Sequence, residues 1–284
     1  MAPDRIHRAL SADGTEIAGR ALGQGPPLVL IHAGLGDGDL DFGALLPLLE
    51  DRFTCYLPST RSRGLSGHSE DLGPERHVED IVAFVDSIGE PVGLVATSGG
   101  AISALGAAAR TAAVAAVAVY EPVAFEVLGE EEGPAFEAAL ARTGELAQQG
   151  RLADAARTLM AALADDDELA ALAASSYFEA AGRYVPVLLG QIQQLAQAHT
   201  PSPTDPSELA RITAPVLILQ GSQTPLRWFA DSVRHVADHV AEAEVRKIPR
   251  TRHHALWVDP EPAARELARF FTTRHAALTP FAAG

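Results

Sequence analysis

One stretch near the middle of the chain constrains the fold more than any other: residues 92–105 read VGLVATSGGAISAL. Its first part is apolar and β-branched, as in a buried strand, and its last part is rich in Ala and Leu, as in a helix. Between them, ATSGG at 96–100 matches the relaxed G-x-S-x-G turn, in which the positions two before and two after the serine are small. Ser98 is therefore a candidate nucleophile, although the stretch taken alone is equally compatible with a plain strand-to-helix turn.

The rest of the chain alternates strand-like and helix-like segments. Residues 5–11 and 16–21 are typical of a hairpin that turns at Asp13-Gly14. Apolar runs predict further strands at residues 27–32, 53–57, 114–120 and 216–220, and another strand is expected at 244–248. Amphipathic spacing predicts helices at 41–49, 74–89, 228–240 and 262–273. This alternation predicts an α/β fold: a mostly parallel twisted sheet with helices on both faces.

One long segment breaks the alternation. From about residue 125 to 200 only helical patterns occur, and they end at the breaker-rich PSPTDP of residues 201–206. We interpret this block as an inserted helical lid. The expected organisation is a first part of the sheet core at 1–124, the lid at 125–206 and the second part of the core at 207–284.

Composition excludes several classes of function. The formal charge of −15 on 284 residues, without a basic stripe, argues against nucleic-acid binding. No apolar run approaches the roughly 20 residues of a membrane span, and the first residues lack the apolar core of a secretory signal. We therefore expect a cytoplasmic protein with neither a membrane nor a nucleic-acid partner.

Metal and cofactor signatures are also missing. His235 and His239 are four residues apart but lack the glutamate and third ligand of a zinc motif. The glycine-rich segments at 23–25 and 34–38 have neither the P-loop lysine nor dinucleotide-binding spacing. The single cysteine, Cys55, lies in an apolar run and is expected to be a buried structural thiol. The sequence thus predicts no metal site and no cofactor.

Candidate site residues follow the predicted strands, because ligands of an open parallel sheet bind beyond the carboxyl ends of its strands. Those ends deliver the loop 33–35, Ser98, Glu121 and the segment 249–254, PRTRHH. A serine hydroxyl needs a histidine base that a carboxylate orients before it can attack a carbonyl. Serine, glutamate and histidine occur here in that order.

This arrangement resembles the α/β-hydrolase family over nearly the whole chain outside the lid. HHALW at 253–257, followed by Asp-Pro-Glu, is similar to the family's catalytic histidine loop, and the spacing to Pro260-Glu261 favours His253 over His254. The resemblance implies that His253 is the catalytic base and that His254 lines the pocket.

Two further loops carry the resemblance. His32 matches the family's His-Gly oxyanion loop, with Ala33 in place of the first glycine, and is expected to hold that loop by hydrogen bonds. The backbone amides of Gly34 and Gly99 would then bind an oxyanion. The loop 61–66, which includes Arg61 and Arg63, resembles the family's Arg-Gly-x-Gly-x-Ser loop and is interpreted as a brace beneath the sheet.

The acid departs from the usual family pattern. Thr224 stands where the family usually carries an aspartate, in a turn after the strand at 216–220, and threonine cannot supply a negative charge. Glu121 is the candidate, since some haloalkane dehalogenases and the zearalenone-hydrolysing lactonases carry their acid one strand closer to the serine. Its alternative role is a loop cap or a partner for arginine. Asp231 and Asp259 are poorer candidates, because each is expected at or in a helix.

The lactonases are the closest in site layout. Their Ser-Gly-Ala elbow, Gly-Leu-Gly loop and Thr-Pro turn are similar to residues 98–101, 34–36 and 224–225. We expect pocket residues near these loops and on the lid, namely Leu35, Tyr184, Leu188, Trp228 and His254.

The resulting functional prediction is a cofactor-free serine hydrolase that cleaves a small apolar ester or lactone through an acyl-enzyme on a Ser98–His253–Glu121 triad. Two alternatives stay open. One is a carbon-carbon hydrolase, lyase or cyclase that uses the same site, and the other is a ligand-binding homologue that no longer turns over. The chain could also act as a homodimer.

Overall fold

A computed structural model describes residues 5–278, with the backbone alone for 275–278. It has eight strands, β1 (Arg5–Leu10), β2 (Glu16–Gly23), β3 (Pro27–Ile31), β4 (Thr54–Pro58), β5 (Val92–Thr97), β6 (Val114–Tyr120), β7 (Val216–Gly221) and β8 (Ala243–Ile248). They form one sheet in the order β1-β2-β4-β3-β5-β6-β7-β8. The β1–β2 and β2–β4 pairs are antiparallel, and the strands from β4 to β8 are parallel. The predicted α/β architecture with a mostly parallel sheet is confirmed.

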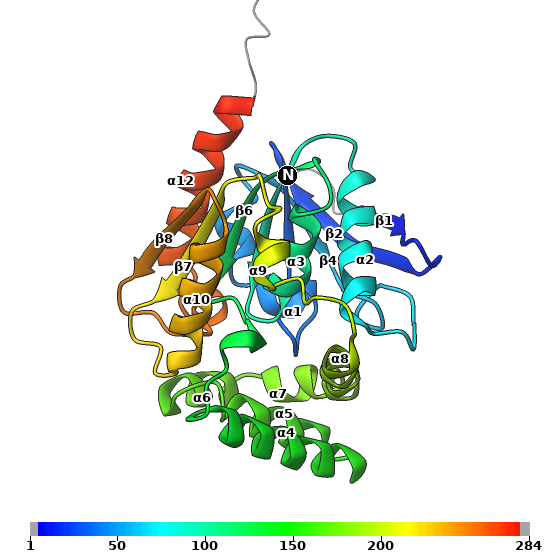
Figure 1. The fold of residues 1–284 in the computed structure, drawn as a ribbon, viewed down its shortest axis with the longest axis vertical. Helices are drawn as coiled ribbons and strands as arrows, with labels where there is room; N and C mark the ends of the chain where they lie inside the picture. The colour runs from blue at the N-terminus through cyan, green and yellow to red at the C-terminus, as the bar shows by residue number, and fades with distance from the viewer. Residues whose placement is uncertain (1–4, 279–284) are drawn as a thin grey trace, which may run out of the picture.

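Helices cover both faces of this sheet (Figure 1). They are α1 (Gly38–Phe42), α2 (Pro74–Asp86), α3 (Gly100–Ala108), α9 (Pro206–Leu209), α10 (Arg227–His239), α11 (Ala255–Val258) and α12 (Glu261–Leu278). Two separate apolar cores result, because alternate residues of a strand point to opposite faces. Val29 and Ile31 of β3 pack with α2, α3 and α10, whereas Leu28 and Leu30 pack with α1, α11 and α12.

A helical layer lies between β6 and β7 in the chain and beyond one end of the sheet in space (Figure 1). It contains a 3-10 turn, η2 (Phe125–Val127), and the helices α4 (Gly133–Gln148), α5 (Leu152–Met160), α6 (Asp166–Ala173), α7 (Tyr177–Gly182) and α8 (Val185–Gln197). Its apolar residues form a third core, which also takes in Leu35, Trp228 and Phe229 from the sheet side. The layer is therefore packed onto the loops that follow the strands.

One predicted helix was wrong. Residues 41–49 were expected to form a continuous helix, but α1 ends at Phe42 and a separate 3-10 turn, η1 (Leu46–Leu48), follows. Pro47 is at the start of η1 and has no N–H to bond to a carbonyl four residues earlier, so it cannot sit inside a continuous helix. The leucines at 45, 46 and 49 are nevertheless buried, so their apolar spacing reflected core packing.

The loop after β4 braces the structure through Arg61. Its side chain is fully buried, and its guanidinium donates to both carboxylate oxygens of Asp80, at 2.8 and 2.7 Å, and to Asp13 at 2.9 Å. Ser62 has a positive φ of 63° in this loop, a conformation that favours glycine. Cys55 is buried in the second core, as its apolar surroundings in the sequence predict.

Candidate active site

Ser98 occupies the sharp turn between β5 and α3. Its φ of 51° lies in the left-handed region, where a side chain is strained, and its N–H bonds to the carbonyl oxygen of Tyr120 at 3.0 Å. A Cβ on Gly100 would lie 2.2 Å from the carbonyl oxygen of His32, so only glycine fits there. The small residues around Ser98 thus let the elbow pass close to the neighbouring loop.

A hydrogen-bonded relay runs from Ser98 into the protein. His253 Nε2 lies 3.1 Å from Ser98 Oγ, and His253 Nδ1 lies 2.9 Å from Glu121 Oε2. The histidine is 3% exposed and the glutamate 0%. The ring of Phe229 stacks on the imidazole, with 3.8 Å between the centroids and 20° between the planes. The imidazole is therefore held between a carboxylate and a hydroxyl, in one ring orientation.

Glu121 reaches this position from the end of β6, at a φ of 41°. Its Oε1 accepts from the Gly221 N–H at 2.8 Å and from the Thr224 hydroxyl at 2.6 Å. Thr224, which replaces the family's usual aspartate, thus donates to the carboxylate. Both oxygens of the glutamate have a partner, as a buried carboxylate requires.

Within residues 5–278, neither of the two alternative acids forms a hydrogen bond or ion pair with Ser98 or His253. Asp231 forms ion pairs with Arg227 and Arg234 on α10. Asp259 is exposed where α11 ends.

The loop after β3 lies against the elbow. His32 Nδ1 donates to the Ala33 carbonyl at 2.8 Å, and its Nε2 accepts from the Thr60 N–H at 3.0 Å. A Cβ on Gly99 would lie 3.8 Å from the Gly34 nitrogen, so these two backbone segments are in contact. His32 holds the loop, and the amides predicted to bind an oxyanion lie on adjacent segments beside Ser98.

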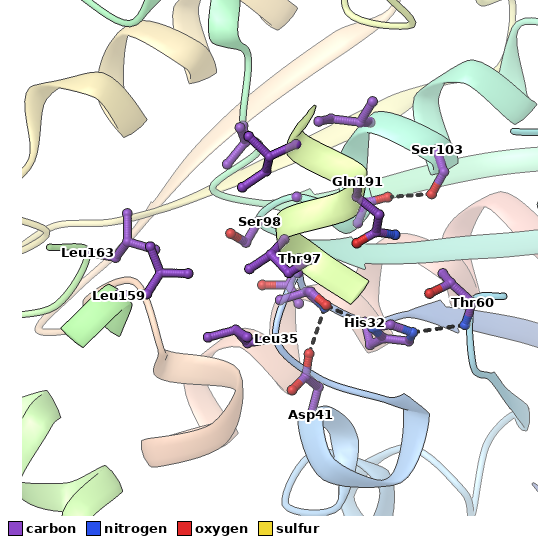
Figure 2. A pocket seen from close by; sticks show the side chains of 18 of the residues that line it. His32, Leu35, Asp41, Thr60, Thr97, Ser98, Ser103, Leu159, Leu163 and Gln191 are labelled. Carbon is purple, nitrogen blue, oxygen red and sulfur yellow. Dashed lines mark hydrogen bonds between the residues drawn. The ribbon is translucent and has the colours of Figure 1, made fainter. Parts of the chain in front are cut away.

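A pocket opens above Ser98 between the sheet and the helical layer. Its walls include four of the five predicted pocket residues: Leu35, Leu188, Trp228 and His254. In Figure 2, Leu159 and Leu163 lie to one side of Ser98, while His32, Thr60, Ser103 and Gln191 lie to the other. The pocket therefore has an aliphatic side and a more polar side.

Tyr184 is the exception among the predicted pocket residues. Its hydroxyl donates to Asp37 and lies 3.3 Å from the Gly64 N–H, and it is not among the residues that line this pocket. The expectation was wrong because α8 turns this side chain toward the loops after β3 and β4.

The comparison with known families rests on most of the chain. The model of the alpha/beta hydrolase family matches residues 28–266, which span the described strands from β3 to β8. The chain belongs to the alpha/beta hydrolase family. No curated protein matches it in sequence.

Solved structures are similar to this hydrolase over nearly its whole length. An alpha/beta hydrolase from Sphaerobacter thermophilus DSM 20745 is 25% identical, with a TM-score of 0.75, and the match covers 93% of this chain and 100% of that one. The esterase RhEst1 from Rhodococcus sp. ECU1013 is 21% identical, with a TM-score of 0.74, and the match covers 94% and 98%. The 2-hydroxy-6-oxo-6-phenylhexa-2,4-dienoate hydrolase of Rhodococcus sp. strain RHA1 is 19% identical, with a TM-score of 0.73 over 95% and 100%.

Several polar pocket residues of this hydrolase were not predicted as site residues. They are Asp41, Thr60, His77, Ser103 and Gln191, and Arg63 was interpreted only as part of a structural loop. Arg63 is 2% exposed, and its Nη2 reaches Gln191 Oε1 at 2.5 Å. These residues lie on α1, on the loop after β4 and on α2, α3 and α8, so no local motif marks them.

Burial sets the charge state of the buried titratable groups around the pocket. It raises the pKa of Asp41 to about 7, and the Ala33 N–H, which donates to this carboxyl at 2.6 Å, opposes that shift. Burial, with His253 as a second cause, lowers the pKa of His254 to about 3, so His254 is neutral. Burial likewise raises the pKa of Glu168, which accepts from the His254 N–H at 2.7 Å.

Two features are absent from the described chain. Within residues 5–278, no three or more His, Cys, Asp or Glu side chains group so that they could hold a metal ion. None of the helices in that range combines the length and the apolarity needed to cross a membrane.

Proposed function

We propose that the protein is a serine hydrolase that cleaves a carboxylic ester or lactone through an acyl-enzyme. The observation that carries this proposal is the unbroken relay Ser98–His253–Glu121 at the floor of a pocket. All the groups that acyl transfer requires are present in the chain itself: a nucleophile, a base, an acid that orients the base, and backbone donors.

In the proposed reaction, Ser98 Oγ bonds to the substrate carbonyl carbon while its proton moves to His253 Nε2. Glu121 accepts a hydrogen bond from His253 Nδ1–H and stabilises the imidazolium that forms. The carbonyl oxygen becomes an oxyanion, which the amides of Gly34 and Gly99 would bind. His253 then returns the proton to the leaving alkoxide as the carbon-oxygen bond breaks, and an acyl-Ser98 ester remains.

The second half of the reaction uses water. His253 takes a proton from the water as its oxygen bonds to the acyl carbon, and then returns that proton to Ser98 Oγ. The products are a carboxylic acid and an alcohol, or a single hydroxy acid when the substrate is a lactone. No electron transfer occurs, so the proposal requires no cofactor.

The pocket supports an apolar substrate. Its aliphatic and aromatic walls come mostly from the helical layer and α10, with Phe136, Leu159, Met160, Leu163 and Trp228 on that side. Apolar walls with a few placed polar groups are typical of small-molecule sites. We further propose that residues 125–206 act as the lid that sets specificity, since they supply most of these walls.

Intact-protein mass after treatment with a fluorophosphonate tests the proposal. We expect one covalent adduct on the wild-type protein and none on Ser98→Ala, because only an activated serine reacts quickly with this probe. Hydrolysis of p-nitrophenyl esters of increasing chain length, followed by a panel of lactones, would then define the substrate. A wild-type protein that forms no Ser98-dependent adduct and hydrolyses no ester would contradict the proposal.

The alternatives predict different results in these assays. A carbon-carbon hydrolase, lyase or cyclase would give products other than an acid and an alcohol from its own substrate. A non-catalytic homologue would bind small apolar molecules without forming an adduct. A cytoplasmic location and a homodimer stay predictions, to be measured by cell fractionation and by light scattering.

A further inference from the structure

Gly34, the proposed oxyanion donor, has no side chain to restrain it, so its amide direction depends on the two peptide groups that flank it. The preceding peptide is fixed through the Ala33 carbonyl, which accepts from His32 Nδ1 at 2.8 Å and from the Gly36 N–H at 3.3 Å. In a planar trans peptide the N–H points opposite to the C=O. These two bonds therefore aim the Gly34 N–H away from His32.

The following peptide is fixed by Arg63. Its Nη1 donates to the Gly34 carbonyl at 2.5 Å and to the Gly36 carbonyl at 3.1 Å. Arg63 is 2% exposed, and no carboxylate of residues 5–278 forms an ion pair with it. Its hydrogen-bond partners are neutral oxygens, which is unusual for a buried guanidinium. The two terminal nitrogens of Arg63 thus donate to the backbone of the proposed oxyanion loop and to one side chain from the helical layer, whereas its buried Nε has no partner.

That side chain is Gln191 on α8. Its Oε1 accepts from Arg63 Nη2 at 2.5 Å, and its Nε2 lies 2.7 Å from His77 Nε2. Burial, helped by Arg63 and Arg61, lowers the pKa of His77 to about 3, so His77 is neutral and accepts from the amide N–H. The amide oxygen of Gln191 is therefore the end that faces Arg63.

Two more side chains approach Arg63 and Gly34: Tyr184, at the N-terminus of α8, and Leu188, within α8. Leu188 Cδ1 lies 3.0 Å from the position that a Cβ on Gly34 would take. The Tyr184 ring lies under the Arg63 guanidinium, 5.5 Å from its centroid. Tyr184, Leu188 and Gln191 follow one another at the spacing of one helix face, so a single face of α8 covers both Arg63 and Gly34.

We infer that Arg63 and Gln191 are positioning residues that set the oxyanion site through the docked lid: Gln191 holds Arg63, and Arg63 holds the Gly34 peptide. This inference rests on the proposed function, because it gives Gly34 the role of oxyanion donor. When α8 is docked, the guanidinium is held through Nη1 and Nη2 and the Gly34 peptide has one orientation. When α8 moves away, Arg63 loses an acceptor and the glycine regains its rotational freedom.

Three variants of one helix test this inference. Gln191→Met keeps the length of the side chain but removes the acceptor for Arg63, whereas Gln191→Glu keeps an oxygen there. Gln194→Met is the matched control, because Gln194 is also on α8 and bonds to the Leu72 N–H and the Glu70 carbonyl without contacting Arg63. Thermal melting confirms that each variant is folded.

The first measurement is kcat and KM for p-nitrophenyl acetate, a small ester. A misplacement of about 1 Å at a reacting group can cost about 10²-fold in rate. We therefore expect kcat of Gln191→Met to fall by about tenfold to 10²-fold, with little change in KM. Gln191→Glu should recover part of this loss, because its carboxylate keeps the acceptor for Arg63 but has no N–H for His77 Nε2, and Gln194→Met should behave as the wild type.

The second measurement is the inhibition constant of a small trifluoromethyl ketone. Ser98 Oγ bonds to the ketone carbon, its proton moves to His253, and the carbonyl oxygen becomes an oxyanion in the proposed site. We expect the inhibition constant of Gln191→Met to rise by the factor by which kcat/KM falls, because both report binding of the oxyanion. A residue that only stabilised the fold would leave both values of the folded enzyme unchanged.

Each outcome decides between the proposals. If the wild type is active and Gln191→Met has the same kcat and inhibition constant, the inference alone is overturned. The same holds if Gln191→Met and Gln194→Met lose activity equally. A wild-type protein without Ser98-dependent hydrolysis or adduct would overturn the proposed function and this inference with it.

Discussion

Replacement of Glu121 by glutamine should nearly abolish turnover, because the surroundings allow the new amide only one orientation. The Oε1 site accepts from the Gly221 N–H at 2.8 Å and from the Thr224 hydroxyl at 2.6 Å. An NH2 group placed there would face the Gly221 N–H, which is also a donor. The amide oxygen must therefore take the Oε1 site, and the NH2 group must face His253 Nδ1.

That orientation forces the wrong tautomer on His253. Its Nδ1 would have to accept from the new NH2 group, so Nε2 would carry the proton and could not take one from Ser98. The same switch lowers kcat by about 10⁴-fold in serine hydrolases with this triad logic. At about 1.36 kcal/mol per tenfold, this corresponds to about 5 kcal/mol of transition-state stabilisation.

The assay is kcat for p-nitrophenyl acetate, with circular dichroism to show that the variant is folded. Thr224→Val is the matched control, since it removes one donor to Glu121 but keeps the carboxylate, its bond from Gly221 and the tautomer of His253. We expect this control to lose far less activity than Glu121→Gln. A folded Glu121→Gln enzyme whose kcat stays within about tenfold of the wild type would refute the assignment of Glu121 as the acid.

Three further predictions concern groups away from the relay. Arg61→Met should lower the free energy of unfolding by about 3–5 kcal/mol, because it leaves the fully buried Asp80 without its cation; an unchanged urea midpoint would contradict this. The unfolded chain ionises Asp41 above about pH 4, whereas burial raises its pKa in the folded protein to about 7, so this group makes stability fall as pH rises from about 4 to 7. Asp41→Asn should therefore lose less stability than the wild type over that window, and parallel stability profiles would show that the reasoning is wrong. Burial raises the pKa of Cys55 to about 12, so a thiol reagent at pH 8 should label it only in denaturant, and fast labelling of the native protein would count against its burial.

The middle of the sheet was predictable because the strands β3 to β7 are buried on both faces and read as mostly apolar runs, whereas β1 and β8 at the edges are largely exposed. β3, for example, is buried at all five of its positions, and it was expected at 27–32. The helix expected at 41–49 was wrong, since apolar spacing there reports contact with the core and does not reveal that Pro47 begins a separate turn. Periodicity predicts which side of a segment is buried better than it predicts the hydrogen bonds within it.

The candidate site likewise has residues that the sequence predicts and residues that it does not. Ser98 and Glu121 each follow a strand directly, and His253 lies in the loop after β8, so the topology of a parallel sheet was enough to predict that the three meet. Arg63 and Gln191 are 128 positions apart, and their contact depends on how the helical layer docks. No spacing rule describes such a contact, and for the same reason Tyr184 was placed in the pocket although it faces Asp37.

The register of β5 and β6 has a consequence for how this enzyme could change. Thr97 and Tyr120 are the last pair of their ladder, and Ser98 and Glu121 are the next residue on each strand. The proposed nucleophile and acid are thus brought side by side by strand pairing, and both come before residues 125–206 in the chain. A foreign helical layer could replace residues 125–206 while this strand pair stays intact, but it would have to supply a new acceptor for Arg63, because Gln191 lies in the replaced segment.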